Sequence, residues 1–204
     1  MGLLTFKGGV HPYEGKDLSK DTPTRELLPK GELVYPLSQH IGAPATPIVA
    51  VGDTVLKGQK IAEAGGFVSA PIHASVSGTV KKIEPRRVPT GDMVNSIVIE
   101  SDGEFKEVEY QAVEDVSALS KEEIINRIKE AGVVGMGGAG FPTHVKLSPK
   151  EPEKIDYIIA NCAECEPYLT ADHRVLLEYA DEIVYGLRAM MKAVAAPEGV
   201  ILIE

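Results

Sequence analysis

A glycine-rich stretch holds the residues whose types and spacing could do chemistry. It carries Gly135, Gly137, Gly138 and Gly140. Glycine accepts positive φ angles and lets the backbone approach a ligand closely. A loop of this kind, here called the glycine loop (135–141), can direct several N–H groups at a phosphate or at a ring edge. Phe141 adds an aromatic face and Lys146 a positive charge, so the sequence predicts a binding site for an anionic, flat cofactor.

Polar side chains also follow the apolar run 155–160, which we expect to be a buried strand. They are Asn161, Cys162, Glu164, Cys165 and Glu166. Open α/β sheets bind ligands outside the carboxyl ends of their strands. An asparagine amide can donate and accept at the edge of a heterocycle, and carboxylates can accept from ring N–H groups or ribose hydroxyls. We therefore expect the glycine loop and this strand end to border one shared cleft.

The glycines match the pattern G-x-G-x-x-G at 135, 137 and 140, but their surroundings do not fit a dinucleotide fingerprint. That fingerprint needs a strand before the loop and a helix that opens at it. Here a predicted helix, 120–131, precedes the loop, and Pro142 rather than a helical pattern follows it. A P-loop is excluded too, because no Gly-Lys-Ser/Thr follows. A tight structural turn between packed elements stays the alternative to a binding loop.

Cys162 and Cys165 form a C-x-x-C motif that allows three interpretations. A redox dithiol would be expected to open a helix, whereas Glu166 and Pro167 intervene here, and carboxylates nearby would raise the thiol pKa values. A zinc or iron–sulfur site needs about four ligands, and the sequence holds no second cysteine pair. We favour the third interpretation, a wall of the cofactor site, and assign no catalytic side chain and no metal ligand.

Composition narrows the class of protein. The chain has 204 residues, of which 44% are hydrophobic and 25% charged, which suits one large or two small globular domains. Its net charge of −9 argues against nucleic acid as a partner and against an anionic membrane surface. No apolar run approaches the ~20 residues of a bilayer span, and no secretory signal or disulfide framework is present. We expect a cytoplasmic protein that reaches the inner face of a membrane through partners.

The first half of the chain predicts an arm and a small all-β domain. Residues 1–35 are rich in glycine, proline and charge without periodicity, so we expect an extended arm that wraps the next domain. Residues 36–101 contain short apolar runs at close spacing, separated by turn residues, which is typical of a barrel-sandwich hybrid. We interpret the lone histidines His11 and His73 as packing or surface residues.

The pattern V-x-V-G-D-x-V-x-x-G-Q-x-I at 49–61 resembles the lipoyl and biotinyl carrier domains. Those carriers present a modifiable lysine at a hairpin tip between the two halves of the domain. The corresponding hairpin here, 63–71, contains no lysine. We therefore expect an unmodified barrel with a structural or docking role.

The second half predicts the beginning of an α/β domain, 120–204, after an acidic linker, 102–119. Ser120 and Glu123 fit a capping box at the start of a helix. We expect a β-α-β unit here. It would consist of a parallel strand at 155–162, helices across 171–196 and a second strand at 200–203. The helical stretch should break where Asp181 can cap the second helix. Two strands are not a finished sheet, so we expect the chain to be part of a longer protein. The fold class is α/β and multi-domain.

Together, GMGGAGFPTHVKL at 135–147 and NCAECEPYLTADHR at 161–174 resemble the flavin-binding core of the NADH-oxidising subunit of respiratory complex I. The chain is closer still to the C subunit of the Rnf-type electron-transport complex, and this resemblance covers nearly its whole length. It implies non-covalent FMN that exchanges hydride with NAD(H) and passes electrons to or from iron–sulfur clusters. The [4Fe-4S] clusters would belong to a cysteine-rich part that this sequence lacks.

The resemblance also implies roles for individual residues. The loop glycines would wall the flavin, Lys146 would hold the FMN phosphate, and Asn161 and Cys165 would face the ring. Phe141 and Glu166 would contact the NAD(H). Complex I has an aspartate where this chain has Ala163, so one flavin contact is missing.

Three functions remain open. The first is the FMN- and NAD(H)-binding module of a membrane-associated, ion-pumping ferredoxin:NAD oxidoreductase, with the other subunits of that complex and a ferredoxin-linked relay as partners. On its own this part would be inactive. The second is a non-catalytic docking subunit with a degenerate flavin fold, as in the sodium-pumping NADH:quinone reductase. The third is a relative of the cobalamin reductases.

Overall fold

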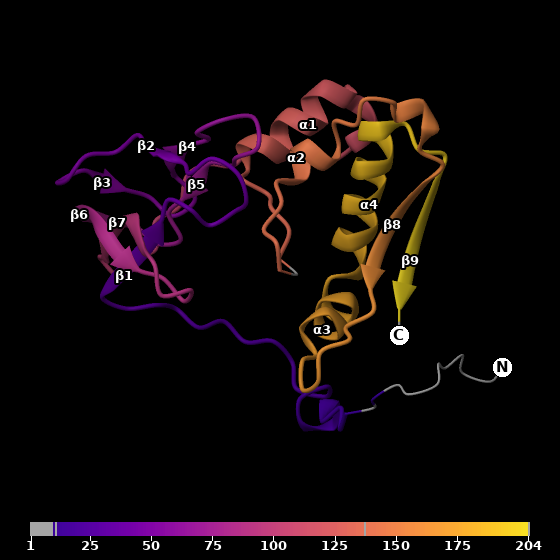
Figure 1. Cartoon of the computed structure of the whole chain (residues 1–204), viewed down its shortest axis with the longest axis horizontal. Helices are drawn as coiled ribbons and strands as arrows, with labels where there is room; N and C mark the ends of the chain where they lie inside the picture. The colour runs from indigo at the N-terminus through magenta and orange to yellow at the C-terminus, as the bar shows by residue number, and fades with distance from the viewer. Residues whose placement is uncertain (1–9, 11, 137, 204) are drawn as a thin grey trace.

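The computed structural model describes residues 10, 12–136 and 138–203. A β-rich part is followed along the chain by an α/β part (Figure 1). The strands of the first part are β1 (Glu32–Pro36), β2 (Thr46–Pro47), β3 (Thr54–Val55), β4 (Lys60–Glu63), β5 (Ile72–His73), β6 (Gly78–Arg87) and β7 (Met93–Ser101). The second part contains α1 (Lys121–Glu130), α2 (Thr143–Lys146), β8 (Tyr157–Cys162), α3 (Ala171–Glu178), α4 (Ala180–Val194) and β9 (Glu198–Ile203). Among the described residues, no helix has the length and apolarity that a membrane span requires.

The β-rich part consists of two antiparallel sheets around one core, as predicted for a barrel-sandwich hybrid. One sheet has the order β1-β7-β6-β3 and the other the order β2-β4-β5. Both sheets contribute to a shared cluster of buried side chains, which includes Ile61, Ile72, Val80, Ile97 and Ile99. Alternate residues of each short strand face this cluster, which is why apolar and turn residues follow one another so closely in the sequence. We refer to residues 32–101 as the barrel.

The prediction of an extended arm over residues 1–35 was wrong at the carboxyl end of that range. β1 lies partly within it and pairs with β7 along its whole length, from Glu32 opposite Glu100 to Pro36 opposite Ser96. Tyr35 is buried in the barrel core, and Leu33 packs against the same core. A strand this short between glycine and proline shows too little alternation to be recognised from sequence.

Truncation of Ile97 should destabilise the barrel strongly. Its side chain is fully buried at the centre of the core, so Ile97→Ala should lower the free energy of unfolding by about 2–5 kcal/mol. Val34→Ala, at a residue with 41% of its surface exposed, should cost less than about 1 kcal/mol. Urea denaturation of both variants measures the difference, and similar losses would contradict this assignment of the core.

The α/β part confirms the predicted helices and the parallel strands. Ser120 and Glu123 form the capping box at the start of α1, and β8 pairs with β9 in parallel. The long helical stretch breaks at Tyr179, as expected near that position, but Tyr179 rather than Asp181 is the N-cap of α4. Asp181 lies in the first turn of α4 instead, where its charge still suits the helix dipole.

The prediction of β8 as a buried strand was wrong for one of its faces. Ile158 packs with α4 and α1 residues in the second core cluster, whereas Tyr157 and Ile159 are more than half exposed. Successive side chains of a strand point to opposite faces, and α4 packs against β8 and β9. The apolar run therefore alternates between covered and open positions within the described residues.

Candidate functional site

The glycine loop is a short hairpin between α1 and α2. Gly135 donates its N–H to the carbonyl of Phe141 at 2.9 Å, and Thr143 donates to that of Val133 at 3.0 Å. Gly138 has φ +139°, a conformation that L side chains rarely adopt, and a Cβ built there meets nothing within 4 Å. The loop therefore presents open backbone at a position where only glycine is unstrained.

A short helix follows the loop, which the sequence did not indicate. α2 begins directly after Pro142, and its four residues end at Lys146. Proline fixes φ near the helical value and lacks the N–H that a first turn would leave unpaired, so it suits the start of a helix. The Rossmann interpretation stays rejected, because α1 and not a strand leads into the loop.

The barrel contacts the glycine loop and the end of α1 that leads into it. Ile41 donates its N–H to the Gly140 carbonyl at 3.2 Å, and a Cβ built on Gly132 would lie 2.5 Å from the Pro71 carbonyl oxygen. Lys60 of β4 forms an ion pair with Glu130 at the end of α1. Figure 1 shows the loop hanging from α1 and α2 beside the barrel.

His144 makes a further contact of this kind that sequence reasoning missed. The residue is 4% exposed, and its Nε2 lies 3.3 Å from the Phe67 carbonyl oxygen at the tip of the β4–β5 hairpin. Burial lowers the pKa of His144, so the neutral imidazole is favoured and its Nε2–H donates to that carbonyl. The only signal in the sequence was its place in THVK, directly after the glycine loop.

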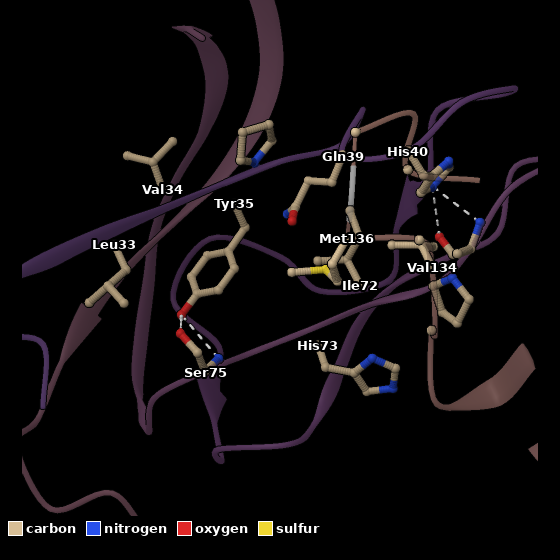
Figure 2. A pocket seen from close by; sticks show the side chains of 17 residues that line it. Leu33, Val34, Tyr35, Gln39, His40, Ile72, His73, Ser75, Val134 and Met136 are labelled. Carbon is tan, nitrogen blue, oxygen red and sulfur yellow. Dashed lines mark hydrogen bonds between the residues drawn. The ribbon is translucent and has the colours of Figure 1, made fainter. Parts of the chain in front are cut away.

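A cavity of about 720 Å³ lies between the barrel and the glycine loop. Figure 2 shows it from close by, with Gln39, His73 and Met136 among its lining residues. The Tyr35 hydroxyl bonds Ser75 at 2.8 Å. The other residues that line the cavity are Gly135, Gly138 and Gly140 of the glycine loop, together with Leu33, Val34, Pro36, His40, Ala70, Pro71, Ile72, Gly132 and Val134.

Two imidazoles, those of His40 and His73, line this cavity. His40 is bound through Nε2 to the backbone of Ala70, at 3.0 Å from the carbonyl oxygen and 3.1 Å from the amide nitrogen. Burial, followed by the positive charge of Lys60, lowers the pKa of His73. The neutral form of His73 is therefore favoured, and the backbone N–H groups of the glycine loop are the candidate donors to an anion.

The strand-end loop, residues 161–170, borders a different cavity of about 310 Å³. Cys162, Glu164 and Thr170 line it, together with His173 of α3. The Glu164 carboxylate accepts from the N–H groups of Asp172 and His173, at 3.1 and 3.4 Å, and so caps α3. Carboxylates are favoured there by the helix dipole.

Other predicted residues of the strand-end loop face solvent. Asn161 is exposed, and its Oδ1 accepts from the Ala163 N–H at 3.2 Å. Cys165 and Glu166 are exposed as well. Both cysteines are free thiols, and burial, with a smaller effect of the Asp172 charge, raises the pKa of Cys162.

The structure brings some of the predicted residues together and not others. Gly135, Gly138 and Gly140 line the larger cavity, whereas Glu164 lines the smaller one. Lys146 is exposed at the end of α2 and Phe141 is half-buried, and neither lines these two cavities. Gly137 lies outside the described residues. The single shared cleft that the sequence suggested is thus two separate cavities in this structure.

The arm contacts the strand-end loop and α3 rather than wrapping the barrel as predicted. Residues 13–24, here called the N-terminal clamp, include a single 3-10 turn, η1 (Lys16–Leu18). Lys16 donates to the Glu164 and Leu169 carbonyls, and Thr24 donates its N–H to the Glu178 carboxylate at 3.1 Å. Contacts between residues about 150 positions apart leave no pattern in a sequence.

Acid should release the carboxyl end of the N-terminal clamp. Hydrogen bonds from Thr24, and after them from Arg174, lower the pKa of Glu178 from 4.5 to about 2. The contact is therefore at full strength above pH 4.5 and is lost as the pH falls through about 2. The Thr24 amide resonance should follow this titration in NMR spectra. In Glu178→Gln the titration should vanish, and a midpoint near 4.5 in the unaltered protein would contradict the assignment.

The residues present fit an FMN-like group in chemistry. The glycine loop offers accessible backbone at Gly138, because a Cβ built there has no neighbour within 4 Å and the space beside it is open to a ligand. The Lys146 side chain is exposed, and the Asn161 amide NH₂ stays available while its oxygen accepts from Ala163. Such donors suit a phosphate and a ring edge. The donor set thus agrees with a flavin mononucleotide, although only the glycine loop lines the larger cavity and neither Lys146 nor Asn161 lines either of the two.

Comparisons with known proteins agree with this division of the chain. Residues 4–104 match the family described as the RnfC barrel sandwich hybrid domain, and residues 128–204 match the Nuo51 FMN-binding domain. The chain is similar to the C subunit of the Na(+)-translocating ferredoxin:NAD(+) oxidoreductase complex of Acetobacterium woodii, with 46% identity over 98% of this chain and 45% of the relative.

Two further relatives show the same pattern. The C subunit of the proton-translocating ferredoxin:NAD(+) oxidoreductase complex of Clostridium ljungdahlii is 46% identical over 99% of this chain and 44% of its own length. The C subunit of the ion-translocating oxidoreductase complex of Haemophilus influenzae is 41% identical over 98% of this chain and 31% of its own length. The chain thus spans less than half the length of these relatives.

Proposed function

Because the chain belongs to the RnfC family, we propose that it is the FMN-binding part of an electron-transport complex that transfers electrons between ferredoxin and NAD(H). The observation that carries the proposal is the glycine loop, whose open backbone at Gly138 lies beside a cavity of about 720 Å³. Bound FMN would supply the exchange of hydride with NAD(H) and of single electrons with iron–sulfur clusters. The relatives named above are subunits of complexes of this kind.

The chain's own residues bind and orient the flavin in this proposal. The N–H groups of the glycine loop and the Lys146 ammonium would hold the phosphate, because charge-assisted hydrogen bonds to phosphate are among the strongest available. Asn161 and Cys165 would face the ring, and Phe141 and Glu166 would contact NAD(H). The proposed hydride exchange needs no side chain of this protein as a general acid or base.

Glu164 has a more specific role in this proposal. Its carboxylate accepts from two backbone N–H groups of α3, so it fixes the strand-end loop relative to that helix. We propose that it acts on the flavin through the placement of its neighbours Ala163 and Cys165 and not through direct contact. Partner subunits would keep the protein at the membrane.

Titration of the full-length protein with FMN tests the proposal. Binding should quench flavin fluorescence with saturable, one-to-one stoichiometry, and addition of NADH to the loaded protein should bleach the flavin absorbance. Riboflavin, which lacks the phosphate, is the matched control ligand and should bind much more weakly. Equal binding of the two compounds would contradict a phosphate site at the glycine loop.

A docking role without flavin is the second candidate function. It is favoured by Ala163 at the position of the complex I aspartate and by the separation of the loop glycines from Glu164, which line two different cavities. In that case the same titration would show no saturable quenching with either compound. The barrel would then serve to join subunits, and the glycine loop would be a packing turn.

A further inference from the structure

The N-terminal clamp holds the strand-end loop by its backbone. Tyr168 donates its N–H to the Glu14 carbonyl at 2.6 Å, and the Lys16 ammonium donates to the Leu169 carbonyl at 3.1 Å and also to that of Glu164. The Lys16 contacts begin and end the segment that contains Cys165 and Glu166. The ammonium thus ties together two carbonyls on either side of these exposed residues.

Side chains of the N-terminal clamp reinforce this contact. Ser19 bonds the Thr170 hydroxyl at 2.9 Å, just before the first turn of α3. The Tyr13 ring meets the Tyr168 ring edge to face, with 6.1 Å between their centroids. Gly15 is buried with φ +64°, and a Cβ there would lie 2.4 Å from the Tyr168 ring. A close approach of this kind is available only to glycine.

The strand-end loop is not in a relaxed conformation. Tyr168 has φ +67°, which is an uncommon and unfavourable value for a bulky aromatic residue. Conformations of this kind persist when the surrounding contacts determine them. Here Glu14 accepts from the Tyr168 N–H and Lys16 donates to the carbonyls of Glu164 and Leu169 on either side of it, so the N-terminal clamp supplies contacts that oppose relaxation.

We propose that Lys16 is a positioning residue for the flavin site, and that the N-terminal clamp holds the strand-end loop in the conformation that binds the cofactor. This inference rests on the proposed function. Lys16 and Lys20 of the N-terminal clamp also line the same cavity as the Cys162 thiol, so we expect a displaced clamp to leave that thiol more accessible. Displacement of the N-terminal clamp should therefore change the reactivity of the Cys162 thiol as well as the affinity for FMN.

Lys16→Met in the full-length protein tests the proposal. Methionine keeps much of the length of the side chain and removes its donors. Amide hydrogen exchange in 163–170 should become about tenfold faster, Cys162 should react several-fold faster with iodoacetamide, and FMN should bind about tenfold more weakly. Lys16→Arg, which keeps donors on a long side chain, should restore much of each value.

Lys30→Met, at an exposed lysine before β1, is the matched control for charge and should change none of the three measurements. The melting temperature should stay within a few degrees in all variants, which separates positioning from general destabilisation. Unchanged exchange in 163–170 would overturn the proposal. Faster exchange with unchanged or tighter FMN binding would overturn it as well, since the clamp would then be irrelevant or obstructive to the site. Failure of the unaltered protein to bind FMN would contradict the proposed function itself, and the positioning role with it.

Discussion

Lys146→Ala should weaken FMN binding by about ten- to a hundredfold, since a hydrogen bond to a charged group contributes about 1.5–3 kcal/mol. Lys146 is exposed at the end of α2, so the substitution removes the ammonium without opening a core. Burial lowers the pKa values of His73 and His144, which leaves these two imidazoles beside the loop mainly neutral. Fluorescence titration of the full-length protein gives the dissociation constants.

Lys150→Ala serves as the control for this measurement. It removes the same charge at an exposed position shortly after α2, so any general attraction between protein and FMN cancels in the comparison. Riboflavin affinity should be the same in both variants, because only the phosphate is expected to contact Lys146. Equal FMN affinities of the two variants would contradict the role of Lys146 as the phosphate ligand.

Gly132→Ala should be the most damaging small substitution at the junction of barrel and glycine loop. Gly132 has φ +67°, and the new Cβ would lie 2.5 Å from the Pro71 carbonyl oxygen. The left-handed backbone alone costs about 1–2 kcal/mol for alanine, and overpacking adds about 1–3 kcal/mol. The free energy of unfolding should therefore fall by about 2–5 kcal/mol in urea denaturation, with faster hydrogen exchange across 133–142.

Gly91→Ala separates the two contributions. Gly91 also has a positive φ, +94°, but a Cβ there meets nothing within 4 Å. It should show the backbone penalty without the clash, and it should leave exchange in the glycine loop unchanged. If both variants lose the same stability, the contact between Gly132 and Pro71 does not constrain the loop.

The features that sequence predicted well are local or periodic. The capping box of α1 depends on two residues three positions apart, Ser120 and Glu123. Its sequence pattern can be recognised without knowledge of the tertiary structure. The parallel pairing of β8 with β9 follows from apolar runs joined by a helical stretch. The two-sheet barrel followed from short apolar runs at close spacing.

The features that sequence missed depend on contacts between distant segments. β1 becomes a strand because β7 offers it a partner, and α2 forms next to a barrel hairpin whose Phe67 carbonyl lies against His144. The N-terminal clamp is recognisable only once Glu14 and Lys16 are seen against the strand-end loop. For the same reason the sequence did not reveal that the loop glycines and Glu164 line different cavities, and the assignment of the site residues stays a prediction.

The N-terminal clamp has a consequence for the order of assembly of the chain. Its contacts join residues 148 to 154 positions apart, whereas neighbouring strands such as β6 and β7 are joined by a short turn. Closing a long loop has a larger entropic cost, and contacts of high sequence separation form late. We therefore expect the barrel to fold while the N-terminal clamp is still unbound. Docking of the clamp onto α3 should be among the last steps of folding.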